Sequence, residues 1–93
     1  MIQIDGYLIH SIRRAAERYG LQMTEAEYET LCRQVAEGRE GCVRLDRVSM
    51  GREKWAIWLK GEWVPVVFDP GEGRIVTVLP RPELRPFAGK LPW

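Results

Sequence analysis

The stretch Trp55–Asp69, with the sequence WAIWLKGEWVPVVFD, decides the fold of this 93-residue chain. Its first part places Trp55, Ile57 and Leu59 at every second position, which is the period of a β-strand with one buried face. The pair Gly61-Glu62 then leads into an apolar run that ends at Phe68, as expected for two strands joined by a two-residue turn. The stretch therefore predicts a β-hairpin.

The segments on either side of this hairpin predict one further strand each. Apolar residues alternate between Val43 and Met50, with a slip in phase at Asp46-Arg47 that indicates a bulge. Downstream, the turn-forming sequence 69–73 precedes a strand over 74–79, which Pro80 stops. Since the connections are short, each strand is expected to lie beside the previous one in an antiparallel sheet. Pro65 lacks a backbone donor, so we expect an outward-facing amide or a bulge at that position.

Two helices are predicted before the sheet. In the first, over 7–19, Ile9, Ile12, Ala16 and Tyr19 recur at helical spacing, and we expect them to form the buried stripe. The second begins at a capping box formed by Thr24 and Glu27 and stops near residue 38. The expected fold is thus α+β, with two N-terminal helices followed by a four-stranded antiparallel meander.

The domain organisation follows from the same pattern. Residues 1–80 are expected to form a single α+β domain, because a chain of this length can bury one core. Four prolines fall within residues 80–93, so 81–93 are expected to be an extended, proline-rich tail. Only Phe87, Leu91 and Trp93 could dock that tail onto the domain.

Composition excludes several functional classes. The net charge is +1, so no strong overall field points to a nucleic-acid partner. Cys32 and Cys42 have nine residues between them and only one histidine is present, so neither a zinc site nor any other metal site is expected. No phosphate-binding loop or cofactor motif is found, and no cofactor is expected. The start lacks a signal peptide and a membrane span, so we expect a cytoplasmic protein with no membrane partner.

The first predicted helix carries the clearest candidate site. His10, Arg13, Arg14 and Glu17 fall within an arc of about 100°, with Arg18 at its edge. This basic cluster faces away from the expected apolar stripe, whereas the second helix is mostly acidic on its outer side. A solvated helix face with arginines paired to Glu17 is the alternative interpretation.

These residue types suit metal-independent cleavage of RNA. That reaction needs a base for the 2′-hydroxyl, an acid for the leaving oxygen and cations for the charge that develops on phosphorus. His10 is the candidate for proton transfer, because its reference pKa lies near neutral pH. Thr77, on a strand face with Ile75 and Leu79, is the second candidate catalytic residue. Thr77 could equally be a strand-forming residue with no catalytic role.

The candidate phosphate-binding residues are arginines, whose planar fork matches a phosphate. They come from the first helix and from the predicted sheet: Arg13, Arg14, Arg18 and Arg47, with Arg74 as an extension of the same surface.

Taken together, the helix around His10, the run Trp63–Asp69 and the strand around Thr77 resemble small phage and prophage proteins. Those proteins in turn resemble the barnase, EndoU, colicin and RelE-like nuclease superfamily. The likeness spans residues 7–80 and implies a domain of the RelE-like toxin type that cleaves or binds RNA. It also implies that His10 and the helical arginines match the family's basic element, and that Thr77 matches its last-strand hydroxyl.

The chain departs from this pattern because it is nearly neutral, which weakens affinity for a polyanion. The alternative is a catalytically inactive, phage-derived module that binds a protein, either an antitoxin or a host factor. In that case the acidic helix and the proline-rich tail would contact the partner. Homodimerisation through an exposed strand edge or the tail aromatics is compatible with either function.

Overall fold

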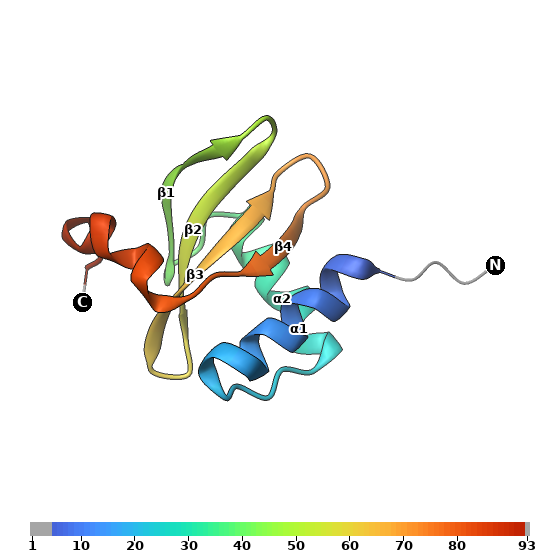
Figure 1. The fold of residues 1–93 in the computed structure, drawn as a ribbon. Helices are drawn as coiled ribbons and strands as arrows, with labels where there is room; N and C mark the ends of the chain where they lie inside the picture. Colours follow the sequence, from blue (N-terminus) through green and yellow to red (C-terminus); the bar gives the residue numbers. More distant parts are fainter. Residues whose placement is uncertain (1–4, 93) are drawn as a thin grey trace.

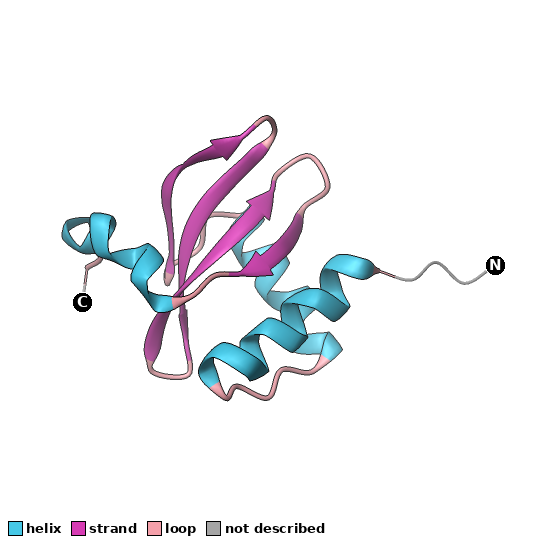
Figure 2. Ribbon diagram, in the orientation of Figure 1, coloured by secondary structure: helices cyan, strands magenta, loops and turns pink. Residues whose placement is uncertain are grey.

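A computed structural model of the chain describes residues 5–92 (Figure 1). In chain order, its elements are α1 (Gly6–Tyr19), α2 (Glu25–Ala36), β1 (Cys42–Ser49), β2 (Arg52–Leu59), β3 (Glu62–Asp69), β4 (Arg74–Val78) and the 3-10 helix η1 (Arg81–Lys90). The four strands form one antiparallel sheet in the order β1-β2-β3-β4. The predicted α+β fold, with two N-terminal helices and a four-stranded meander, is confirmed (Figure 2).

Side chains satisfy the free backbone groups at the helix ends. Asp5 Oδ1 accepts hydrogen bonds from the amides of Tyr7 and Leu8, each 3.1 Å long, and so caps α1. Gly20, with φ of 64°, ends this helix in the left-handed conformation that glycine adopts at least cost. Thr24 and Glu27 form the predicted capping box of α2.

The sheet has two differently covered faces. The helix face carries the main core, in which α1 and α2 pack on six buried strand residues: Ile57, Val64, Val66, Phe68, Ile75 and Val78. Strand alternation assigns the opposite, outer face to Lys54, Ala56, Trp63, Val67 and Thr77. Burial on both faces explains why β3 reads as an almost continuous apolar run.

The extended conformation expected for the tail is wrong for residues 81–90, which form the 3-10 helix η1. Leu84, Phe87 and Leu91 recur at spacings that put them on one side, where they pack on Leu45, Ala56 and Trp63 in a second apolar cluster. The prolines do not oppose this conformation, because the φ angle that proline fixes lies within the 3-10 range. Trp93, which could also have docked the tail, lies outside the described residues.

The buried stripe of α1 also differs from the expectation. Ser11 and Ala15 are buried, whereas Ile9 is 45% exposed and Ala16 is exposed. The reason is a polar contact that helical periodicity does not reveal: Ser11 Oγ donates to the carbonyl of Ile75 at 3.2 Å. This bond turns Ser11 toward β4, so the apolar stripe that faces the core runs through Leu8, Ile12, Ala15 and Tyr19 instead.

The free edge of β4 is closed by side chains of both helices. Tyr28 in α2 donates its hydroxyl to the Ile75 carbonyl at 2.6 Å, beside the Ser11 bond. The amide of Ile75 donates to Cys32 Sγ at 3.3 Å. Just beyond β4, on the side that faces β3, Tyr19 of α1 donates to the Leu79 carbonyl at 2.6 Å. Helix α1 therefore lies along the β4 edge rather than under the sheet (Figure 1).

Pro65 sits in neither of the two settings expected for it. It belongs to the interior strand β3, and its pairing with Ala56 continues without a bulge. Within the described residues, no helix is long or apolar enough to pass through a membrane.

Candidate nucleic-acid interface

The basic residues of α1 lie on its exposed side, as predicted. His10, Arg13 and Arg18 are exposed, and none of their side chains has a hydrogen bond or an ion pair with another described residue. Arg14 is half-buried and forms an ion pair of 2.7 Å with Glu17. Both members of this pair remain partly in solvent, so the pair contributes little to stability and can open to accept another anion.

A line along α1 connects this helix to the sheet. Tyr7, Arg14 and Arg18 are separated by seven and four residues, so they follow one another along a single side of the helix. At the start of that line, Arg52 Nη2 donates to the Tyr7 hydroxyl at 3.1 Å, with its guanidinium 5.8 Å from the centre of the Tyr7 ring. The line therefore leads from α1 onto the first residue of β2.

Arg52 and Lys54 extend the basic line across the outer face. Alternation puts both side chains on the same side of β2, and Lys54 is paired through Val67 with Thr77 in the register of the three strands. Because neighbouring strands are about 4.8 Å apart, Lys54 and Thr77 lie about 10 Å from each other across the sheet. We call the set Tyr7, Arg14, Arg18, Arg52, Lys54 and Thr77 the basic face.

Thr77 is on the outer face, and the prediction that it shares a face with Ile75 is wrong. Val67 pairs with Thr77 and Phe68 pairs with Ile75, so Val76 has no partner and forms a β-bulge. The extra residue reverses the alternation between Ile75 and Thr77. Ile75 remains in the main core, whereas Thr77 is half-buried on the side that carries Lys54.

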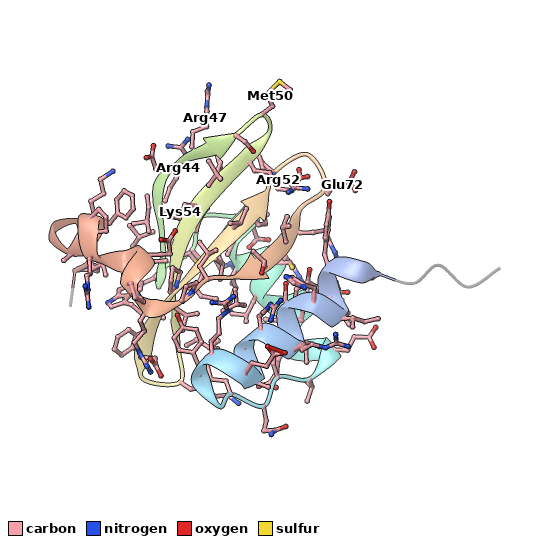
Figure 3. All side chains as sticks on the ribbon, viewed as in Figure 1. Arg44, Arg47, Met50, Arg52, Lys54 and Glu72 are labelled. Carbon is pink, nitrogen blue, oxygen red and sulfur yellow. The ribbon has the colours of Figure 1, made fainter. Side chains whose placement is uncertain are left out.

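The structure gathers some of the predicted site residues and separates others. His10 lies about 60° around α1 from Tyr7, on the solvent side of the basic line, and Arg13 lies further around in the same direction. Arg47 is exposed near the end of the β1–β2 hairpin, away from α1 (Figure 3). Arg47 is therefore not part of the basic face, and the catalytic roles of His10 and Thr77 stay predictions.

Arg74 has a structural position. Its guanidinium forms ion pairs with Asp5 and, at 2.6 Å, with Glu29, and it lies 4.9 Å from the centre of the Tyr28 ring. These contacts tie the start of β4 to the N-terminal ends of both helices. Arg74 is thus committed to carboxylates of its own chain.

Two acidic side chains border the basic face. Glu83 of η1 accepts a hydrogen bond of 3.2 Å from Lys54 Nζ, which also lies 5.3 Å from the centre of the Phe87 ring. The second acidic side chain is that of Glu17, which forms an ion pair with Arg14. The two carboxylates offset part of the positive charge of this surface, so the basic face is less positive than its number of cations suggests.

The cysteines are unsuited to nucleophilic chemistry. Both are free thiols, and burial raises the pKa of Cys32 and of Cys42 above that of an ordinary thiol. A raised pKa lowers the fraction of reactive thiolate at neutral pH. Within residues 5–92, no group of three or more His, Cys, Asp or Glu side chains could hold a metal ion.

Sequence reasoning missed Tyr7, Arg52 and Lys54. A signal for two of them was present, because Arg52 and Lys54 fall in phase with Ala56 and so share one strand face. The position of Tyr7 could not be obtained this way, since its contact with Arg52 joins residues that are 45 positions apart.

Comparison with known proteins adds no relative. No protein family, no curated protein and no solved structure matches this chain.

Proposed function

We propose that this protein binds RNA through the basic face. The observation that carries the proposal is the continuous line formed by Arg18, Arg14 and Tyr7 on α1 with Arg52 and Lys54 on β2. Arginine recognises phosphate through two parallel hydrogen bonds, and a row of arginines suits the repeating phosphates of a nucleic-acid strand. This assignment agrees with the superfamily resemblance, which implies RNA as the substrate.

The fold supports a binding surface of modest strength. Arg14 and Lys54 each have a carboxylate partner, so phosphate must compete with Glu17 and Glu83 for them. Arg18 has no ion pair among the described residues and is available without such competition. Because non-specific affinity comes from the number of neutralised phosphates, we expect binding that weakens strongly with salt.

Cleavage of the bound RNA is the finer part of the proposal, and it needs no metal ion. In this reaction His10 accepts the proton of the 2′-hydroxyl, whose oxygen bonds to phosphorus as the bond from phosphorus to the 5′-oxygen breaks, and the leaving 5′-oxygen takes a proton from water. The hydroxyl of Thr77 donates a hydrogen bond to the phosphate. The position of Thr77 supports its role, because Thr77 lies on the same outer face as Lys54, two strands away, so one RNA strand that crosses this face can meet both side chains. Because His10 lies on the solvent side of α1, the bound RNA must bend over this helix to reach His10.

Binding is tested with a fluorescently labelled RNA oligonucleotide in the presence of chelator. The variant R14Q/R18Q removes two adjacent cations of the basic face and should weaken binding about tenfold or more, since a hydrogen bond to a charged group contributes about 1.5–3 kcal/mol. The matched control is R33Q on α2, which removes an exposed arginine elsewhere. Equal affinities of the parent and R14Q/R18Q would rule out the basic face as the binding surface.

Cleavage is tested separately by following the length of the RNA over time. His10→Ala and Thr77→Ala should each slow turnover about 100-fold, since His10 is a positioned proton-transfer group and Thr77 a hydrogen-bond donor to the developing negative charge. Turnover equal in parent and variants would leave RNA binding without catalysis.

A second candidate function, the binding of a protein, is favoured by one observation. Helix α2 carries Glu25, Glu27 and Glu29 against a single Arg33, so it presents an acidic surface apart from the basic face. Glu25 has no ion pair with a described residue, whereas Glu27 and Glu29 are paired with Lys60 and Arg74. The proline-rich tail does not contribute to such a site through its apolar residues, because Leu84, Phe87 and Leu91 pack on the sheet. A basic partner bound at α2 would leave the basic face free.

A further inference from the structure

A hollow of about 390 Å³ lies between α2 and the end of β2, apart from the basic face. Its apolar wall consists of Ala26, Leu31, Trp58 and Leu59, and Glu27 and Thr30 lie at its rim. The volume falls within the range of pockets that hold a small ligand or a buried side chain. We call it the α2 groove. An apolar wall with a carboxylate at its rim suits an apolar side chain that is accompanied by a cation.

The β1–β2 hairpin presents an apolar side chain accompanied by a cation, at the end of β2 that lies away from the α2 groove. Met50 lies in the turn between β1 and β2, and its side chain is 97% exposed. Val48, near the end of β1, is 48% exposed. Arg47 is exposed and has no ion pair with any described residue. Figure 3 shows Arg47 and Met50 projecting from the tip of this hairpin. Methionine is flexible and polarizable and is enriched in protein interfaces, where it fills irregular pockets.

The tip and the groove are complementary but cannot meet within one molecule. They occupy the two ends of β2, since the tip precedes Arg52 and the groove contains Trp58 and Leu59. The tip carries the exposed cation Arg47, and α2 carries three glutamates against one arginine. We propose that Met50 of one copy of this chain inserts into the α2 groove of a second copy, with Arg47 directed toward Glu27.

This contact joins two different surfaces, so a pair of copies keeps one free groove, on the first copy, and one free tip, on the second. Such a heterologous contact builds rings or open chains rather than a closed dimer. The buried area is limited to a hairpin tip, which is characteristic of a weak and transient interface. Glu27 already has a partner in Lys60 at 3.9 Å, but both side chains are exposed and can rearrange in favour of Arg47.

The experiment uses two variants that each block one surface. Met50→Asp places a charge on the tip, and Thr30→Arg places a cation at the rim of the groove; both positions are exposed, so the fold should be preserved, as circular dichroism can verify. Sedimentation equilibrium of the parent should give an average mass that rises with concentration above the 10.8 kDa of the monomer. Each variant alone should stay at the monomer mass.

The decisive measurement is the equimolar mixture of the two variants. One intact tip and one intact groove remain, so the mixture should form a 1:1 pair of twice the monomer mass and grow no further. A parent that stays monomeric at about millimolar concentration would overturn the proposal, because even a weak interface populates oligomers there. A Thr30→Arg variant that associates like the parent would also overturn it, since association would then not use the groove.

Discussion

At the scale of single residues, the pairing of Pro65 explains why the Tyr19 hydroxyl bonds to the backbone of Leu79. The amide of Leu79 donates to the Pro65 carbonyl at 2.8 Å, so the returning bond of this antiparallel pair would run from the amide of residue 65 to the Leu79 carbonyl. Proline has no amide hydrogen. The Tyr19 hydroxyl donates to the Leu79 carbonyl instead, at 2.6 Å. A side chain from α1 thus replaces a missing bond of the sheet.

Replacing Tyr19 by Phe should therefore destabilise the protein by about 1–2 kcal/mol, because the Leu79 carbonyl loses its donor. The free energy of unfolding in urea measures this cost. Pro65→Ala restores a backbone amide at the partner position, so Tyr19→Phe should cost less in that background. Equal costs in the two backgrounds would show that the hydroxyl does not compensate for the proline.

Glu53 provides a residue-scale prediction for acid. Hydrogen bonds from the Trp55 indole nitrogen, at 3.1 Å, and from Arg44, at 2.9 Å, stabilise its carboxylate and hold the pKa of Glu53 below the ordinary value. A lowered pKa in the folded state contributes stability above the unfolded pKa, and this contribution is lost as the pH falls through the folded pKa. The affected window lies below about pH 4.5.

We therefore expect Glu53→Gln to have a lower Tm than the parent at pH 7 and a smaller further loss of Tm between pH 5 and pH 3. Thermal unfolding followed by circular dichroism measures both effects. Glu72→Gln is the control, because Glu72 is an exposed carboxylate in a turn whose side chain has no ion pair among the described residues. A Glu53→Gln variant that follows the parent at every pH would contradict the assignment.

At the scale of secondary-structure elements, η1 covers part of the outer face of the sheet. Its apolar residues cover Leu45 and Trp63, and Glu83 pairs with Lys54 of the basic face. Lys90 Nζ donates to the Leu45 carbonyl at 2.9 Å and so caps a backbone group of the edge strand β1. None of the residues of η1 is fully buried, which indicates that its docking depends on a few contacts.

Phe87→Ala should weaken the packing of η1 on the sheet, because Phe87 is the largest apolar residue that η1 packs on the second cluster. We expect a loss of about 1–2 kcal/mol in unfolding free energy, less than the 3–5 kcal/mol of a fully buried phenylalanine. Tryptophan fluorescence should also shift to longer wavelength, since the buried Trp63 gains contact with water. An unchanged spectrum would show that Trp63 stays covered without the Phe87 ring.

The elements themselves were predictable, but their faces were not. Local signals such as the alternation around Ile57 and the capping box at Thr24 gave the order of helices and strands. The orientation of α1 depends on the bond from Ser11 to Ile75, which joins residues 64 positions apart. Likewise, the side of the sheet that Thr77 occupies depends on the bulge at Val76, and nothing in the run 74–78 marks that bulge. The sequence therefore indicated which types of residue form the candidate site, but not which of them lie on the same face.

At the scale of the whole molecule, charge is separated although the net charge is only +1. Helix α1 carries three arginines against one glutamate, and the hairpin of β1 and β2 carries four cations against two carboxylates. Helix α2 has the opposite balance. Since salt screens charges more than about 8–10 Å apart, a nucleic acid on the basic face is only weakly repelled by α2. A nearly neutral chain can thus still present a cationic surface.

This separation gives a prediction for the salt dependence of RNA binding. Each phosphate neutralised on a single strand contributes about 0.7 to the slope of log affinity against log salt concentration. Arg14 and Arg18 lie one helical turn apart on the same side of α1, so each can contact its own phosphate. Replacing Arg18 by Gln should therefore lower the slope by about 0.7, and the double variant R14Q/R18Q by about 1.4. The R33Q control on α2 should keep the parent slope. Fluorescence anisotropy at about 50–300 mM salt measures these slopes, and a common slope for parent and variants would place the phosphates on another part of the surface.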